Sequence, residues 1–340
     1  MRLLHLIAMT VISGSFIGCF SLSNHAPENM QRPEFSCMVA LKTVYSMKGV
    51  GMDLPDDDFT RMKKAGIDII STEWGMEEGV ERAIGFLDQA YVAGLKVVMD
   101  GGFSYTAWGF TQDDWYHLPS GKKPVWQKET VQSWITALKD HPAIYAWDIS
   151  NEFGENLPSG VAAKNTEWPA TRITTEQLAQ AKADVLAIDP SRPIHVRMYE
   201  WDEKNVPDHI RGLLENRIAD IISLNLYSNY LVDGKLQWPD VIADVGASRV
   251  TGIKKMSPDT LVWLSIAVFE YHSLFARPTV DNLNRDFEEA LKINNLDGIS
   301  FFCWGPVEQW DPSCDWYLPK TGADLWDTIQ KNIKQTQRGK

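Results

Sequence analysis

The sequence has few cysteines, a deficit of positive charge and, beyond its N-terminus, no long hydrophobic run. Four of its 340 residues are cysteines, and 33 Lys and Arg residues stand against 45 Asp and Glu, which gives a formal net charge of -12. Because nucleic-acid phosphates attract Lys and Arg, this acidic balance argues against a nucleic-acid partner. No later run reaches the roughly 20 apolar residues that a membrane-spanning helix needs.

Motifs of several other enzyme classes are missing as well. No Gly-rich phosphate loop follows a first strand, which disfavours a doubly wound nucleotide-binding sheet. The seven His residues form neither an H-x-H pair nor an H-E-x-x-H motif, which disfavours a zinc hydrolase. The G-x-S-x-G motif of many esterases is also absent. We therefore expect a protein that requires no metal and no cofactor.

The one long apolar run lies at the N-terminus and has the pattern of an export signal. Arg2 precedes the apolar residues 3–12, and small residues then lead to Cys19. We predict that residues 1–18 are a signal peptide. Residues 19–36 are polar and contain proline, so we predict that they form a flexible tether.

Residues 16–19, Phe-Ile-Gly-Cys, resemble the lipobox of bacterial lipoproteins. In that motif the Cys becomes the acylated N-terminus of the mature protein, which implies a lipid anchor on Cys19. We expect an exported monomer that contacts a bacterial membrane only through this anchor, facing the periplasm or the cell surface; ordinary secretion is the alternative. The other cysteines are Cys37, Cys303 and Cys314, an odd number, so at least one forms no disulfide among them; whether Cys303 and Cys314 bridge a loop stays open.

From residue 46 onward, apolar strand-like segments alternate with amphipathic helical patterns. The predicted strands are residues 47–52, 67–72, 96–99, 144–150, 194–198, 218–226, 261–268 and 298–302. The helical patterns between them are residues 55–66, 79–94, 129–140, 174–187 and 279–293. Strands that are apolar almost throughout indicate a parallel sheet covered on both faces.

These units predict the α/β class and a single (β/α)8 TIM barrel with extended βα loops over residues 37–340. The first strand is ambiguous, because residues 37–45 are also apolar and compete with residues 47–52 for its place. An open doubly wound sheet is the rival architecture, and the missing phosphate loop disfavours it.

In such a barrel the catalytic groups lie at the C-terminal ends of the strands. Asn151 and Glu152 end the fourth predicted strand, in AWDISNE, and Glu270 ends the seventh, in VWLSIAVFE. Two carboxyl groups that face one cleft are what glycoside hydrolysis requires. Glu200, which ends the fifth predicted strand, is the substitute candidate.

The pattern AWDISNEFG, followed by a Glu that closes a seventh strand, resembles clan A of the glycoside hydrolases. This retaining (β/α)8 group includes cellulase-like and mannanase-like enzymes, and the likeness lies near family 5. It implies cleavage of a β-linked glycan of the β-glucan or β-mannan type, with Glu152 as general acid/base and Glu270 as nucleophile. It also implies that Asn151 binds the sugar 2-hydroxyl, Tyr227 orients the nucleophile and Trp304 forms the floor of a subsite.

Other polar and aromatic residues at strand ends or in loops are candidates for substrate binding: Asn225, Glu73, Asp100, Trp74 and Trp201. The chain has 14 Trp residues, and aromatic faces stack on the C–H faces of pyranose rings. We expect two or three loop Trp residues to line subsites, from the set Trp74, Trp108, Trp115, Trp168, Trp201, Trp238 and Trp310. Trp147, within a predicted strand, is expected in the core.

The chain departs from the family 5 pattern at three strand ends. Residues 71–74 lack the Arg that usually ends strand two, residues 225–227 read Asn-Leu-Tyr in place of His-x-Tyr, and residues 100–102 lack the His that often follows strand three. The sequence therefore leaves open the sugar, the linkage, the family within the clan, and internal or terminal attack. The alternative function is a glycan-binding surface lipoprotein with the same barrel and no turnover.

Overall fold

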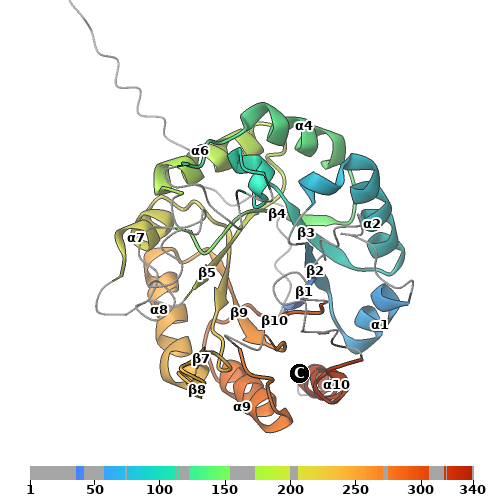
Figure 1. The fold of residues 1–340 in the computed structure, drawn as a ribbon, viewed down its shortest axis with the longest axis vertical. Coiled ribbons are helices and arrows are strands. Elements are labelled where there is room, and N and C mark those ends of the chain that lie inside the picture. Colours follow the sequence, from blue (N-terminus) through green and yellow to red (C-terminus); the bar gives the residue numbers. More distant parts are fainter. Residues whose placement is uncertain are drawn as a thin grey trace, which may run out of the picture.

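Eight parallel strands form one curled sheet with helices around it (Figure 1). The computed structural model describes residues 36–41, 57–72, 75–111, 114, 122–153, 173–199, 206–270, 275–305, 318 and 320–338. The strands are β1 Ser36–Leu41, β2 Ile69–Thr72, β3 Lys96–Asp100, β4 Ile144–Asn151, β5 Ile194–Tyr199, β6 Ile221–Asn225, β9 Leu261–Ala267 and β10 Gly298–Phe302. They pair in the order β1-β10-β9-β6-β5-β4-β3-β2, and β1 also pairs with β2, so the sheet closes on itself.

A helix follows each strand of the sheet, as the parallel pairing requires. These are α1 Asp58–Ala65, α2 Val80–Val92, α4 Lys128–Leu138, α6 Thr175–Leu186, α7 Asp208–Glu215, α8 Ala247–Met256, α9 Val280–Leu291 and α10 Ala323–Arg338. Short elements are η1 Met76–Glu78, η2 Tyr105–Trp108, η4 Ile242–Gly246 and the hairpin of β7 Leu231–Val232 and β8 Lys235–Leu236. Each long helix turns an apolar stripe to the sheet; in α2, Ala83, Phe86, Leu87 and Ala90 are buried at helical spacing.

Side chains fill the interior of the curled sheet. One buried cluster, drawn from five strands, contains Ile69, Val98, Ala146, Ile221, Leu261 and Trp263. The ring of Trp263 stacks on Tyr145 at 6.1 Å. The interior is therefore packed, and a site of the kind that such a sheet carries would lie at the strand ends.

The predicted α/β class and parallel sheet are confirmed, and seven of the predicted strands coincide with β2–β6, β9 and β10. The prediction for the first strand is wrong, because β1 takes that place with Ser36–Leu41, which overlaps the competing apolar segment at residues 37–41. Its register uses both neighbours, β10 and β2. Residues 47–52, and all of the predicted signal peptide and tether except Ser36, lie outside the described residues.

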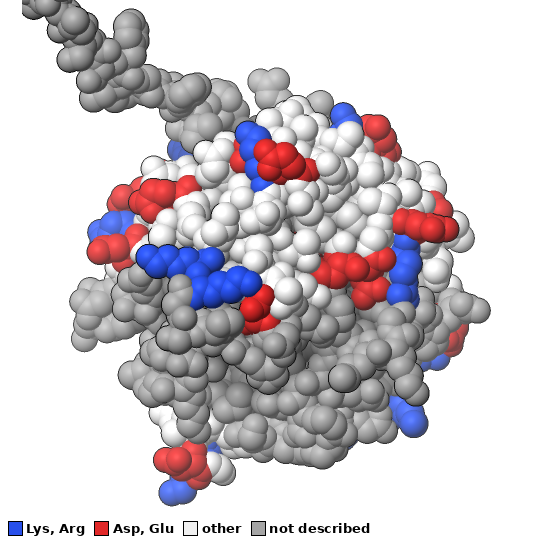
Figure 2. Space-filling view, turned by 45° about the horizontal axis from the view of Figure 1, so that its top comes forward, with Lys and Arg blue, Asp and Glu red and all other residues white. Residues whose placement is uncertain are grey.

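Charged side chains of both signs lie beside one another on the surface. Figure 2 shows several such small mixed groups on one face. Ion pairs of this kind include Arg277–Asp324 at 2.7 Å and Lys63–Asp68 at 3.2 Å, and such exposed pairs each contribute little stability. In the part of the chain that is described, no helix is long and apolar enough to cross a membrane.

Candidate active site

Glu152 lies at the point where β4 ends. Its backbone N–H donates to the carbonyl oxygen of Arg197 at 2.9 Å, so the pairing with β5 continues one residue beyond the strand. Its φ angle of 49° is in the left-handed region, which few side chains other than Gly, Asn and Asp adopt. The backbone thus turns at this residue, and its half-buried side chain stands at the C-terminal rim of the sheet.

Asn225, the last residue of β6, contacts this carboxylate directly. Its Nδ2 donates to Glu152 Oε1 at 2.8 Å and lies 3.4 Å from Asn151 Oδ1. Since β6 is separated from β4 by β5, the contact crosses the top of an intervening strand. The structure therefore brings together three of the residues predicted for the site.

A Tyr–His pair adjoins Glu152. The hydroxyl group of Tyr199, at the end of β5, lies 3.0 Å from Nε2 of His209 on α7. Burial raises the pKa of Tyr199, and the negative charge of Glu152 raises it further. Burial lowers the pKa of His209 to about 4, so both groups are uncharged at neutral pH. This pair was not among the predicted site residues, although a Tyr that ends a buried strand was a usable signal.

Glu270 lies three residues beyond the end of β9 and is partly buried. Its chain neighbour Phe269 packs against Tyr227, with ring centroids 5.7 Å apart, and against Phe302 at 5.1 Å. Asn229 Nδ2 donates to the carbonyl oxygen of Phe269 at 2.8 Å. Packing and a backbone hydrogen bond thus fix the chain that presents Glu270, and Tyr227 lies in the same cluster.

A charged network lies buried in the strands below Glu152. Arg197 Nη2 lies 2.7 Å from Asp148 Oδ2, and His195 Nδ1 lies 3.3 Å from Asp148 Oδ1. The same Arg197 nitrogen donates to the carbonyl oxygen of Thr72 at 3.1 Å. A guanidinium from β5 therefore reaches the end of β2, the strand whose end lacks the Arg of the family 5 pattern.

Asp100, predicted to bind sugar, is completely buried at the end of β3. Its Oδ1 accepts the backbone N–H groups of Gly102 and Phe103 at 2.9 Å and of Ser104 at 3.3 Å. Its Oδ2 accepts the N–H of Met76 at 3.1 Å. These contacts give Asp100 a structural role in the loops. Its substrate-binding role stays a prediction, and the complete burial of the residue does not support it.

Trp304 and Trp108 are also completely buried. The indole N–H of Trp304 donates to Asp58 Oδ2 at 2.8 Å, and its ring meets Trp326 of α10 edge to face at 4.9 Å. Trp108 donates to the carbonyl oxygen of Gly102 at 2.8 Å. Trp108, one of the loop Trp residues considered for a subsite, therefore belongs to the core, and the expected core position of Trp147 is confirmed. Trp304 as the floor of a subsite stays a prediction.

Several predicted residues lie outside the described residues: Cys19, Glu73, Trp74, Trp115, Trp168, Glu200, Trp201, Trp310 and Cys314. Trp238 is described; it is partly buried and stacks on Tyr230 at 6.1 Å. Within the described ranges, no three His, Cys, Asp or Glu side chains are grouped so as to hold a metal ion.

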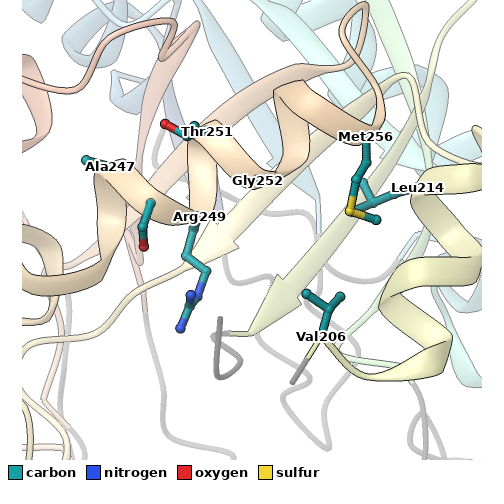
Figure 3. Close-up of a pocket in the computed structure, with 8 residues that line it drawn as sticks. Val206, Leu214, Ala247, Arg249, Thr251, Gly252 and Met256 are labelled. Atoms are coloured by element: carbon teal, nitrogen blue, oxygen red, sulfur yellow. The ribbon is translucent and has the colours of Figure 1, made fainter. Parts of the chain in front are cut away.

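A cavity of 540 Å³ is lined by residues of α7 and α8 and by Val206, which precedes α7 (Figure 3). Leu214 of α7 and Thr251, Gly252 and Met256 of α8 line it. The buried side chain of Arg249 extends from α8 beside it. The residues that line this cavity do not include Asn151, Glu152, Tyr199 or Asn225.

No family model matches the chain, and no curated protein sequence matches it. Solved structures do match. A beta-galactosidase from the psychrophilic Marinomonas ef1 is 11% identical with a TM-score of 0.56, over 89% of this chain and 60% of that one. A GH2 beta-galacturonidase from Eisenbergiella tayi is 15% identical with a TM-score of 0.58, over 89% of this chain and 51% of that one.

A third match extends over both chains. A provisionally assigned alpha-L-fucosidase from Bacteroides thetaiotaomicron is 14% identical with a TM-score of 0.56, over 97% of this chain and 99% of that one. The alignments span only about half to three-fifths of the galacturonidase and galactosidase chains. At these identities the likeness shows the fold alone, which is glycosidase-like.

Proposed function

We propose that the protein is a retaining glycoside hydrolase of clan A that cleaves a β-linked glycan, of the β-glucan or β-mannan type. One observation carries the proposal: Glu152 directly follows β4 and Glu270 follows β9, so both carboxylates stand at the same rim of a parallel sheet. In this proposal the strands and helices are one complete (β/α)8 TIM barrel with extended βα loops.

The proposed reaction has two steps. The Glu270 carboxylate attacks the anomeric carbon, while the Glu152 carboxyl group gives its proton to the departing oxygen. Glu152, now ionised, then removes a proton from water, which displaces Glu270 and releases the sugar with its original configuration. Asn151 binds the 2-hydroxyl group of the attacked sugar, and Tyr227 orients Glu270.

Further sugar contacts are proposed for Glu73, Trp74 and Trp201, which follow β2 and β5 in the sequence. Asp100 and Trp304 are completely buried, so their predicted sugar contacts are the least supported part of the proposed binding surface. The names of the galactosidase and the galacturonidase support a β-linkage more than a particular sugar, since each names a different one.

Hydrolysis of a glycan panel tests the proposal. The protein is incubated with β-glucans, β-mannans, xylans and galactans, together with an aryl α-L-fucoside, and new reducing ends are measured. NMR of the first product formed shows whether its anomeric configuration is retained. Glu270→Gln should be inactive, and Glu215→Gln, an exposed change on α7, should not differ from wild type. An inverted product, or hydrolysis of the α-fucoside alone, would contradict the proposal. Binding of a glycan without new reducing ends would favour the surface lipoprotein.

We also propose export with a lipid on Cys19, on the basis of the Phe-Ile-Gly-Cys sequence that follows the apolar N-terminus. The intact mass of the protein from membranes should correspond to a chain that begins at Cys19 and carries lipid, and Cys19→Ala should remove it from the membrane fraction. A mature protein that begins elsewhere would support ordinary secretion instead.

A further inference from the structure

The contact between Asn225 and Glu152 has a geometry that fixes both groups. The distance of 2.8 Å is typical of a hydrogen bond to an ionised carboxylate. The same Nδ2 faces the Oδ1 atom of Asn151 at 3.4 Å. Only the amide nitrogen can donate, so two acceptors on one side determine which end of the Asn225 amide faces Glu152.

Pairing of β6 with both neighbouring strands fixes the backbone of Asn225. It is the final residue of β6, in register with Tyr199 of β5 and with Ser265 of β9, and the residue is 8% exposed. A side chain at this position has little surface for a sugar, because its amide nitrogen already faces two protein oxygens. These facts set Asn225 apart from a substrate ligand.

We propose that Asn225 is a positioning residue for Glu152: its amide occupies Oε1, stabilises the ionised carboxylate and directs the acidic proton to Oε2. The inference rests on the proposed function and adds a role for this residue within it. An amide N–H cannot accept, so a proton on Oε1 would face a donor. Glu152 therefore carries its proton on Oε2 when it acts as an acid, and it is held in the same orientation when it acts as a base.

The charge states of the groups near Glu152 on neighbouring elements decide how clearly the effect of the Asn225 hydrogen bond can be measured. On β5, Tyr199 is neutral at ordinary pH, because burial and the charge of Glu152 raise its pKa, and the guanidinium of Arg197 is paired with Asp148. His209 on α7 has a pKa of about 4 and gains charge only in acid. Glu270, which follows β9, is the second carboxylate that our proposal places at this rim.

Two substitutions test the inference. Asn225→Asp keeps the shape of the side chain but replaces the donor by an acceptor, and Asn225→Ala removes the donor without adding charge. The matched control is Asn216→Asp, since Asn216 is exposed at the end of α7 and its amide donates to Gly212. Urea unfolding of each variant establishes that it folds.

The deciding measurement does not need activity. The titration of Glu152 is followed by carbon-13 NMR of labelled Glu side chains, with Glu152→Gln identifying the signal. Loss of the donor should move the titration midpoint up by about one pH unit in Asn225→Ala and by more in Asn225→Asp, with no change in Asn216→Asp. A midpoint that is unchanged in both Asn225 variants overturns the inference, whether or not any glycan is cleaved.

Kinetics then separates positioning from substrate binding. If a glycan is hydrolysed, Asn225→Ala should lower kcat by about 10- to 100-fold with KM nearly constant, and the alkaline limb of the pH profile should move to higher pH. The loss should be smaller for aryl glycosides whose leaving group needs no proton. A rise in KM with an unmoved pH profile would make Asn225 a sugar ligand and overturn the inference.

Discussion

Two acidic centres stand on the same rim of the sheet, and they are held in different ways. At the ends of β2 and β3, Glu77 and Asp100 accept hydrogen bonds from backbone N–H groups, and Asp100 is completely buried. At the end of β4, the half-buried Glu152 accepts a side-chain amide of Asn225. The position of a carboxylate at a strand end therefore does not reveal its task; its partners and its exposure do.

The first centre links two loops to each other. Asp100 of β3 accepts the N–H of Met76 in η1, and Glu77 in η1 accepts the N–H of Thr106 in η2 at 3.1 Å. Each loop thus receives an acceptor from the neighbouring unit. Backbone donors of this kind are lost only when the loop itself unfolds, whereas a side-chain donor can be exchanged by a single substitution. The first centre suits structure and the second suits chemistry.

The largest expected effect is on the rate of hydrolysis, which substitutions at the two centres should change by very different amounts. Glu270→Ala should reduce hydrolysis by about 10⁴-fold or more, because no covalent intermediate can form, and Glu152→Ala by about 10²- to 10⁴-fold on a natural glycan. Glu152→Ala should still react with activated aryl glycosides, and azide should restore its second step as a sugar azide of retained configuration. Glu77→Gln at the first centre should leave kcat within a few-fold of wild type. If Glu77→Gln lost as much activity as the Glu152 and Glu270 variants, the two centres would not differ in function.

The second prediction concerns stability. Asp100→Ala leaves four backbone N–H groups without their acceptor, so we expect the free energy of unfolding to fall by about 2–4 kcal/mol. Urea unfolding at pH 7 measures it. Asp244→Ala, an exposed change on η4, should alter the free energy of unfolding by less than about 0.5 kcal/mol. If Asp100→Ala unfolds at the same urea concentration as wild type, Asp100 does not hold the loops together.

Much of the fold was predictable from hydrophobic patterning. The strands β4 and β9 are apolar to within a few residues of Glu152 and Glu270, so their ends could be located from the sequence. The place of β1 could not, because two adjacent apolar segments compete and only the pairing with β2 and β10 decides between them. Helix α7 was not among the predicted helical patterns, although it is as long as α1, which was.

Less of the candidate site was predictable, because its contacts cross strands. The hydrogen bond from Asn225 to Glu152 depends on the relative register of β4, β5 and β6. The cradle of Asp100 had a local signal: an Asp followed by two Gly residues favours hydrogen bonds from the next backbone N–H groups. The burial of Trp304 depends on α10, which the helical patterns did not include.

The smallest expected effect is a pH dependence at the first centre. Burial, together with the negative charge of the nearby Asp100 carboxylate, raises the pKa of Glu77 to about 7. Its Oε2 is buried and has no hydrogen-bond donor among the described residues, so the ionised form is poorly satisfied there. The unfolded chain loses this proton near the ordinary value of 4.5, and the folded protein keeps it until about pH 7. The folded state is therefore penalised as the pH rises from about 4.5 to 7, and the penalty is complete above that.

Glu77→Gln removes this penalty, because a neutral amide takes the place of a carboxyl group that must ionise. The variant should be more stable than wild type by about 1–2 kcal/mol at pH 8, and the difference should vanish below about pH 4.5. Urea midpoints measured from pH 4 to 8 give the curve, and Glu81→Gln, an exposed change at the start of α2, should follow wild type at every pH. A constant offset across the whole range would attribute the effect to packing of the amide. A variant that is less stable at pH 8 would show that the η1–η2 link needs the Glu77 charge, and the two centres would then differ less than their partners suggest.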